Sequence, residues 1–306
     1  MTATPVCYPW HEMMERRSDL IYDVGLFDGG DMAYYLFRGY NVVAIDANPL
    51  MIENARVRFA KEIEARRLTL LNVGIAEKPG VATFWTSGMP EWSSFNKAIA
   101  SRNGTACQGV SVPMVPFSEL LATYGVPYYL KIDIEGNDQL CVDALSPATI
   151  PRFISVEAEC IDDDTMLSDE EAVAMLKILR DVGYVKFKLV DQARKWRALR
   201  PNLIANLFKL VTYSASHGRL QVRGLSGITD RFADTAQLAE LGFVFPPGSS
   251  GPWGDDIPGG WMTFEKARSA YLRERRAFRI LRRFAAKGGK NVRELYSFWY
   301  DWHATY

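Results

Sequence analysis

The sequence predicts an α/β protein whose mostly parallel sheet carries helices on both faces. Short apolar runs rich in β-branched residues recur between residues 20 and 190, and such runs are typical of strands buried on both faces. Segments of helical length separate them, which favours strand-helix-strand units. The 306 residues are 48% hydrophobic and 24% charged, which suits a soluble globular chain with a sizeable core.

Helix and loop signals lie between the expected strands. Asn48 precedes a proline, so it predicts a capped helix that continues at helical spacing to residue 66. Ser168 and Glu171 form a capping box ahead of an amphipathic helix. Residues 88–105, rich in Ser, Asn and Gly, indicate a loop. The principal strands are expected at residues 20–24, 41–45, 68–73, 128–134, 153–158 and 184–190, with a short strand at 82–85.

Beyond the sixth strand the regular alternation fails. Residues 245–260 are so rich in Gly and Pro that neither a regular helix nor a central strand is expected there. A long basic helix is expected at 263–290 and a final strand at 297–303. These patterns divide the chain into an N-terminal extension (1–19), a core (20–190), a substrate-binding insertion or lid (191–262), and the basic helix with the final strand (263–306).

Charge and composition exclude several classes of partner. Lys plus Arg and Asp plus Glu number 36 each, so net charge gives no reason to expect a specific nucleic acid. The sequence contains no run of about 18 apolar residues, so no transmembrane helix is expected. We expect a cytoplasmic protein. The four cysteines form no C-x-x-C pair. We interpret the basic helix as a solvated helical face that packs on the domain; the alternative is that it contacts an acidic surface. The sequence is compatible with a homo-oligomer.

The turn after the first strand indicates a nucleoside cofactor. Asp23-Val24-Gly25 leaves an apolar run through glycine, and Asp46 ends a second run about twenty residues later, where an acid accepts hydrogen bonds from a ribose. Neither a Walker loop nor G-x-G-x-x-G occurs. Asp23, Asp28 and Asp31 would instead attract the ammonium and sulfonium of S-adenosylmethionine. The alternative is that these aspartates only cap the next helix.

Longer segments resemble the FkbM-type family of S-adenosylmethionine-dependent methyltransferases. The matching segments include Tyr22 to Gly25, Val42 to Pro49, Leu70 to Gly74, Pro90 to Phe95, Lys131 to Gly136, Ser155 to Glu157, Gly248 to Pro252 and Trp299 to Ala304. The resemblance implies a class I methyltransferase fold, a seven-stranded Rossmann-like sheet whose last strand is antiparallel. Where many relatives have asparagine in the turn, this chain has Phe27.

The resemblance also implies roles for individual residues. Asp23 and Gly25 would shape the methionine end of the cofactor site, Asp46 would bind the ribose, and Asp133 would face the reacting methyl group. The residues expected to bind the cofactor are Asp23, Gly25, Asp28, Gly29, Asp46, Asn72, Gly74 and Ser94.

Methyl transfer to an alcohol needs an aligned nucleophile whose proton is removed during attack. The expected catalytic residues are Asp133, Glu157 and His217. One alternative is that Asp133, Glu135 and Glu157 bind Mg²⁺, because oxygen ligands suit that cation; the other is that one carboxylate is the base and the rest order the loop.

Tryptophans at 92, 253 and 261 are expected to form platforms for sugar rings. The sequence therefore predicts an O-methyltransferase that acts on a sugar, a glycan or a hydroxylated small molecule. Two alternatives remain, an NAD-dependent oxidoreductase on a similar sheet and a non-catalytic adaptor that retains the fold.

Overall fold

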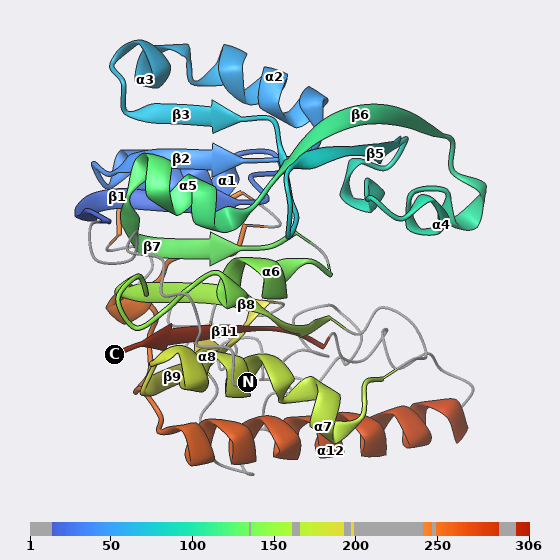
Figure 1. The fold of residues 1–306 in the computed structure, drawn as a ribbon. Helices are drawn as coiled ribbons and strands as arrows, with labels where there is room; N and C mark the ends of the chain where they lie inside the picture. Colours follow the sequence, from blue (N-terminus) through green and yellow to red (C-terminus); the bar gives the residue numbers. More distant parts are fainter. Residues whose placement is uncertain are drawn as a thin grey trace, which may run out of the picture. The chain divides into compact units, whose positions relative to one another are not determined.

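The computed structural model describes residues 14–134, 136–160, 166–192, 197–198, 241–246, 249–287 and 298–306. The chain divides into two compact units, Met1–Ile154 and Ser155–Tyr306. Each unit is an α/β assembly in which helices lie against strands (Figure 1).

The first unit is built on four parallel strands. They are β1 (Arg16–Val24), β2 (Asn41–Ile45), β3 (Leu68–Leu71) and β7 (Val126–Ile132), in the order β3-β2-β1-β7. The register sets Asp23 of β1 opposite Ala44 of β2 and Lys131 of β7. Because the strands are parallel, their carboxyl ends share one edge, where ligands of such sheets bind.

Helices of the first unit follow the expected order. They are α1 (Gly30–Phe37), α2 (Pro49–Arg58), α3 (Ala60–Glu64), α5 (Phe117–Tyr124) and α6 (Asp138–Asp143). Helix α1 contacts β2, while α2 and α3 contact β3 (Figure 1). Asn48 caps α2, since its side chain accepts a hydrogen bond from the Leu50 amide. The single helix expected to reach residue 66 is wrong, because the buried Phe59 departs from helical geometry and separates α2 from α3.

A second, smaller sheet was only partly expected. Its strands are β4 (Gly74–Ile75), β6 (Cys107–Val115) and β5 (Gly80–Ser87), in the order β4-β6-β5 (Figure 1). The segment 88–105 is not wholly loop, because it contains η2 (Pro90–Trp92), α4 (Lys97–Ala100) and η3 (Arg102–Gly104). The Asn96 side chain caps α4 by accepting from the Ala98 amide, so a residue type that suggested a loop begins a helix.

In the second unit the last strand of the chain lies between two earlier strands. Its strands are β8 (Phe153–Cys160), β9 (Lys186–Asp191), β10 (Arg197–Ala198) and β11 (Trp299–Thr305), in the order β8-β11-β9-β10. Strand β11 runs antiparallel to β9, as the family resemblance implies for the final strand. Within the described residues the α/β fold with a mostly parallel sheet of seven main strands is therefore confirmed, and β10 adds a two-residue strand.

Helices of the second unit are α7 (Asp169–Ala172), α8 (Ala174–Val182) and α12 (Phe264–Lys287), with a short turn η5 (Gly254–Asp256). The predicted capping box is confirmed, because Ser168 and Glu171 exchange hydrogen bonds at the start of α7. Helix α12 contacts β9 and α8. No helix in the described part of the chain is long and apolar enough to cross a membrane.

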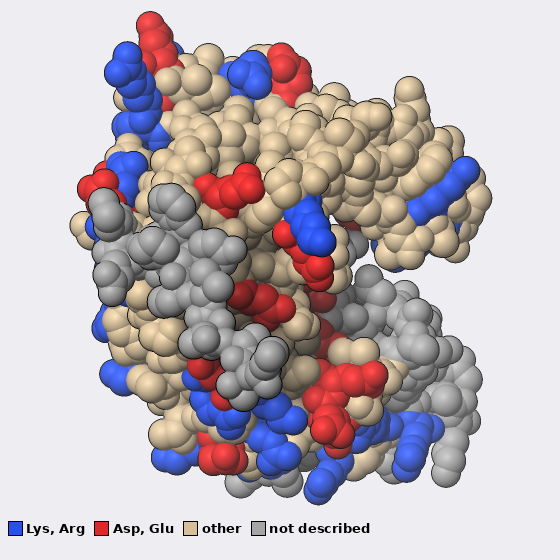
Figure 2. Space-filling model, viewed as in Figure 1, with Lys and Arg blue, Asp and Glu red and all other residues tan. Residues whose placement is uncertain are grey.

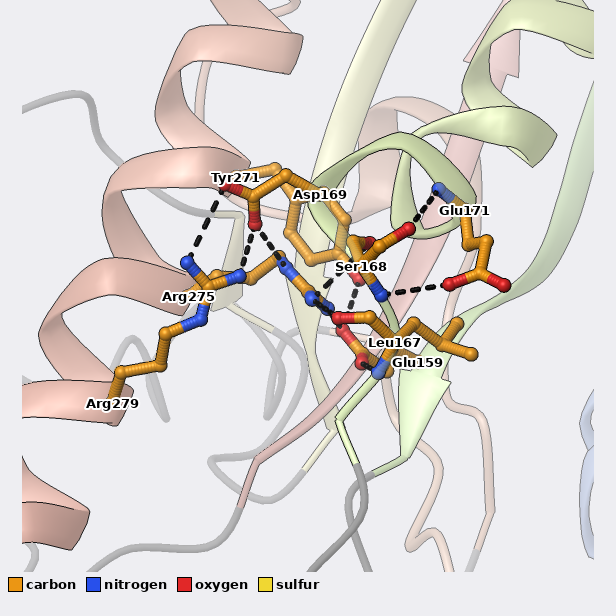
Figure 3. Close-up of polar contacts among 8 residues, drawn as sticks. All are labelled: Glu159, Leu167, Ser168, Asp169, Glu171, Tyr271, Arg275 and Arg279. Carbon is orange, nitrogen blue, oxygen red and sulfur yellow. Dashed lines mark hydrogen bonds and ion pairs between the residues drawn. The ribbon is translucent and has the colours of Figure 1, made fainter.

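A buried polar network fixes α12 against β8 and α7 (Figure 3). Glu159 of β8 accepts hydrogen bonds from the Tyr271 hydroxyl, at 2.8 Å, and from the Arg275 guanidinium. Arg275 also bonds Asp169 at 3.2 Å, and Arg279 pairs with the same carboxylate. Two arginines of the basic helix therefore serve packing, while Lys266, Arg268, Arg276 and Arg283 of α12 are exposed. Lysines, arginines and acidic residues are all seen on the face of the molecule drawn in Figure 2.

Candidate functional site

The turn after β1 lies against the ends of two neighbouring strands. The amides of Gly25 and Leu26 both donate to the Ile45 carbonyl, at 2.8 and 3.2 Å. Gly25 has φ +86°, and a Cβ atom there would lie 1.9 Å from the Asp133 carbonyl oxygen. Only glycine therefore fits between the turn and the end of β7.

Asp23 and Lys131 form a buried ion pair beneath this turn. Asp23 is fully buried, and Lys131 Nζ lies 3.3 Å from its Oδ1. The same ammonium donates to the Gly25 carbonyl at 2.6 Å and lies 3.6 Å from Asp133 Oδ2. Neither oxygen of Asp23 accepts a hydrogen bond of normal geometry from any described residue. The carboxylate thus retains unused acceptor capacity, which is costly in a protein interior.

The charges of this pair perturb each other. Burial raises the pKa of Asp23 to about 7, and the Lys131 ammonium opposes that rise. Burial lowers the pKa of Lys131, but the negative charges of Asp23, Asp133 and Asp31 outweigh it and hold that pKa above its usual value. Lys131 therefore stays protonated, and the ionisation of Asp23 is finely balanced near neutral pH.

Asp46 closes the neighbouring turn after β2. Its Oδ2 accepts from the Phe27 amide at 3.0 Å and its Oδ1 accepts from the Asn48 amide at 2.7 Å. Burial raises the pKa of Asp46 to about 6, against the effect of these two amides. Asn72 donates its side-chain amide to the carbonyls of Asp46 and Ala47, at 2.9 and 3.1 Å. The structure thus brings Asp46 and Asn72 together, next to the turn that holds Asp23.

The remaining residues of the first turn have local roles. Phe27 lies in the left-handed region, with φ +47°, which asparagine tolerates better than phenylalanine. Asp28 is exposed and its Oδ1 accepts from the Gly30 amide, so it orders the start of α1. Gly29 is the N-cap of α1 with φ +75°. Asp28 therefore bonds the first amide of α1 without being its N-cap, whereas the buried Asp23 lies in β1 and does not cap the helix.

Gly74 and Ser94 belong to the region around the small sheet. A Cβ atom on Gly74 would lie 2.6 Å from both Met114 Sδ and Phe95 Cζ, so this position too excludes a side chain. Ser94 is buried, and its hydroxyl accepts from the Asn96 amide at 3.1 Å. Its described hydrogen bond thus shapes the segment before α4.

The expected catalytic and metal residues are only partly described. Asp133 directly follows β7, and its side chain is 40% exposed. Glu157 is half-buried in β8 of the second unit, where its charge raises the pKa of Tyr271 after the larger effect of burial. Glu135 and His217 lie outside the described residues. No group of three His, Cys, Asp or Glu suited to a metal occurs in the described ranges, so the proposed Mg²⁺ ligand set stays a prediction.

An open pocket of about 580 Å³ lies in the first unit. Phe95 and Met114, which contact the space at Gly74, form part of its apolar wall with Ile75 and Leu140. Gly136, shortly after Asp133, lines it as well. The polar groups on its wall are two carboxylates and two amides, namely Glu77, Asp143, Asn137 and Gln139. No Lys, Arg or His is among the described residues that line it.

One of the three tryptophans is too buried to be the expected platform. Trp253 is 4% exposed and belongs to the core of the second unit. The Arg102 guanidinium lies 4.3 Å from the centre of the Trp92 ring, and the Lys188 ammonium lies 4.5 Å from that of Trp261. Cationic side chains therefore already cover one face of each of these two rings.

Sequence reasoning missed two residues of this region. Lys131 was noted only as part of a motif, although the β1–β7 register places it opposite Asp23. Asp138 accepts from the Ile134 amide at 3.0 Å, and burial raises its pKa. An aspartate shortly after a strand end, four residues beyond the amide that it bonds, is the signal for such a loop-ordering contact.

The mostly parallel sheet with an antiparallel last strand, and the acidic turn at its carboxyl edge, are the features expected of a class I methyltransferase. Residues 23–186 match the family model described as the methyltransferase FkbM domain, which is more than half of the chain. The chain therefore belongs to the FkbM methyltransferase family, and S-adenosylmethionine is the methyl donor that the family implies.

The chain is also similar to two solved methyltransferase structures. The chain is similar to precorrin-6y C5,15-methyltransferase from Geobacter metallireducens GS-15, with 15% identity, a TM-score of 0.32, and coverage of 59% of this chain and 70% of that chain. It is also similar to the methyltransferase domain of bacterial CtHen1, with 10% identity, a TM-score of 0.34, and coverage of 61% and 84%. No curated protein matches the chain.

Proposed function

We propose that this methyltransferase acts on a hydroxyl oxygen of a sugar, a glycan or a hydroxylated small molecule. The observation that carries the proposal is the pocket beside Gly74 and Gly136, whose wall combines apolar side chains with carboxylates and amides. Such a wall suits an acceptor with an apolar face and several hydroxyl donors. Because no described cationic side chain lines it, a phosphorylated acceptor would find no counter-charge there.

The residues around the first turn fit the methyl donor. The negative charge of the Asp23 carboxylate, which lies beneath the turn, would attract the methionyl ammonium. Gly25 lets the turn pass against the Asp133 carbonyl, where a Cβ atom would clash. Asp46 would accept from the ribose hydroxyls with its remaining lone pairs, and Asn72 and Gly74 would border the adenine. S-adenosylmethionine, when bound, supplies an electrophilic methyl group.

Asp133 is the proposed general base. Its half-exposed carboxylate follows β7 directly, and Gly136, three residues later, lines the pocket. There it would accept the proton that the acceptor hydroxyl loses as its oxygen bonds to the methyl carbon. Lys131, 3.6 Å away, would hold this carboxylate in place. Glu157 and His217 remain the alternative bases.

Labelled methyl transfer to a panel of acceptors tests this function. The panel contains neutral glycosides, phosphorylated sugars and amines, and the methylated atom is identified by mass spectrometry. We expect methyl ethers of neutral hydroxylated compounds. Preferential labelling of nitrogen or of phosphorylated sugars would refute the proposed acceptor class.

A pair of variants tests the base. Asp133→Asn should lower kcat by about 10²- to 10⁴-fold while S-adenosylhomocysteine binds within about threefold of the original affinity. Asp19→Asn is the matched control, because Asp19 is an exposed carboxylate of β1 that pairs with Arg17. Its activity should not change. Equal activity of both variants would remove Asp133 from the catalytic step.

A further inference from the structure

Lys131 occupies an unusual position for a lysine. It is 3% exposed, lies near the carboxyl end of β7, and its ammonium reaches the Gly25 carbonyl, the Asp23 carboxylate and the Asp133 carboxylate. These three groups belong to the turn after β1, to β1 itself and to the segment after β7. One cation therefore links all the segments that meet at the methionine end of the proposed cofactor site.

The charges around Lys131 are unevenly matched. The carboxylates that act on its ammonium come from β1, α1, the turn after β2 and the segment after β7, and they are Asp23, Asp31, Asp46 and Asp133. The Lys131 ammonium is the one positive charge among these groups, and of the carboxylates Asp23 and Asp31 are buried while the Asp133 side chain is 40% exposed. The surplus of negative charge favours a further cation from outside the protein.

Removing the lysine charge would change the state of Asp23. Burial already raises the pKa of this carboxyl to about 7, and Lys131 is the main opposing influence. With a neutral residue at position 131, Asp31 and Asp133 would still repel a charge on Asp23. Asp23 would then take up a proton at neutral pH and lose its attraction for an ammonium group.

We infer that Lys131 is a positioning residue of the cofactor site, which keeps Asp23 ionised and fixes the Gly25 carbonyl so that both receive the cationic end of the methyl donor. The inference rests on the proposed function, because it assumes that S-adenosylmethionine binds at this turn. Lys131 acts through Asp23 and Gly25 and does not itself touch the reacting atoms.

Calorimetry with two ligands separates positioning from folding. S-adenosylhomocysteine carries the methionyl ammonium, whereas adenosine lacks the amino-acid end. Lys131→Met should lower affinity for S-adenosylhomocysteine about 10- to 100-fold at pH 7 and leave adenosine affinity within about threefold. The pH midpoint of S-adenosylhomocysteine binding should move upward by at least about one unit, because Asp23 ionises later.

Two further variants keep the test decisive if Lys131→Met folds poorly. Asp23→Asn and the double variant Asp23→Asn with Lys131→Met leave no buried carboxylate at this position. We expect their S-adenosylhomocysteine affinities to differ by less than about tenfold, because only the effect of Lys131 on the Gly25 carbonyl then separates them. Lys188→Met is the matched control, since Lys188 is 1% exposed and donates to the Gly254 and Ile257 carbonyls at 2.9 and 2.7 Å. It should leave ligand affinity and its pH midpoint unchanged.

The outcomes are distinct. The inference is overturned if Lys131→Met binds S-adenosylhomocysteine as the original chain does, if it loses both ligands equally, or if the double variant binds at least tenfold more weakly than Asp23→Asn. If the original chain binds neither S-adenosylmethionine nor S-adenosylhomocysteine, the proposed function and the inference both fail.

Discussion

Each unit contains a buried carboxylate paired with a cation, and the two carboxylates differ in whether they accept hydrogen bonds. In the second unit Glu159 is 5% exposed, its Oε2 accepts from Tyr271 and Arg275, and its Oε1 accepts from the Leu167 amide at 3.3 Å (Figure 3). In the first unit neither oxygen of the fully buried Asp23 accepts a normal hydrogen bond from the described residues, although Lys131 lies 3.3 Å away.

The difference separates a structural charge from a binding charge. A buried carboxylate that is fully hydrogen-bonded holds elements together, and its loss is felt in stability. A buried carboxylate with unused acceptor capacity costs stability and is retained where a ligand completes it. We therefore expect changes at Glu159 and its partners to affect folding, and changes at Asp23 to affect cofactor affinity.

The largest expected effect is on the structural side. Arg275→Met should lower the free energy of unfolding by about 3–5 kcal/mol, because it leaves the buried Glu159 carboxylate without its cation. Urea denaturation measures this change. Arg279→Met is the control, since its pair with Asp169 is partly exposed, and should cost under about 1 kcal/mol. If the two variants lost the same unfolding free energy, or if Arg275→Met changed S-adenosylhomocysteine affinity, the distinction between a structural and a binding carboxylate would be wrong.

Asp23→Asn should affect cofactor affinity more than stability, the opposite of Arg275→Met. We expect S-adenosylhomocysteine affinity to fall about 10- to 100-fold, or about 1.4–2.7 kcal/mol, because the asparagine has no charge for the methionyl ammonium. Stability should fall less than in Arg275→Met, since the Lys131 ammonium keeps the Gly25 carbonyl and the Asp133 carboxylate as partners. Calorimetry and urea denaturation on the same samples test both halves. A loss of stability without a loss of affinity would make Asp23 structural.

The ionisation of Asp23 should make both stability and S-adenosylhomocysteine affinity depend on pH. The pKa of Asp23 is raised from 3.8 to about 7 in the folded chain, so its ionisation lowers the stability of the ligand-free protein as pH rises between about 4 and 7. The same ionisation creates the cation site. Affinity for S-adenosylhomocysteine should thus rise up to about tenfold per pH unit below 7 and level off above it.

A comparison of variants assigns that pH dependence. In Asp23→Asn the rise near pH 7 should disappear, and the dependence that remains should come from Asp46, whose pKa is about 6. An identical pH profile in Asp23→Asn and the original chain would show that another group titrates.

The smallest expected effect concerns the turn itself. Phe27→Asn should stabilise the protein by about 0.5–1 kcal/mol, because asparagine adopts the φ of +47° with less strain. The Asp46 carboxylate bonds the backbone amide of this residue, so that contact should persist. A thermal melt measures the gain. A loss of stability would mean that the phenylalanine ring contributes more than the strain costs.

The sequence predicted the parts of the site that depend on local pattern. The glycine of the Asp23-Val24-Gly25 turn and the acid at Asp46 follow apolar strands, and both lie where the parallel sheet predicts a ligand edge. Strand β6 was missed because it is largely exposed and contains Gly109 and Pro113, so it lacks an apolar run. Period and composition identify buried strands better than half-exposed ones.

The role of Lys131 depends on register, which a single sequence does not contain. A lysine inside the run Tyr128 to Ile134 suggests an outward-facing residue, whereas the pairing of β1 with β7 turns it towards Asp23. The hydrogen-bond state of Asp23 likewise depends on groups brought together by the fold. Long-range contacts of this kind explain why the sequence could name candidate residues for this edge of the sheet but not the interactions among them.

The position of β11 has a consequence for synthesis on the ribosome. The strand order of the second unit is β8-β11-β9-β10, so residues 299–305 fill a gap between two strands that are made much earlier. The residues of the first unit, by contrast, are all present once residue 154 has emerged. A nascent chain would thus expose the flanks of β8 and β9 until β11 arrives, and during that interval a chaperone would have the most to protect.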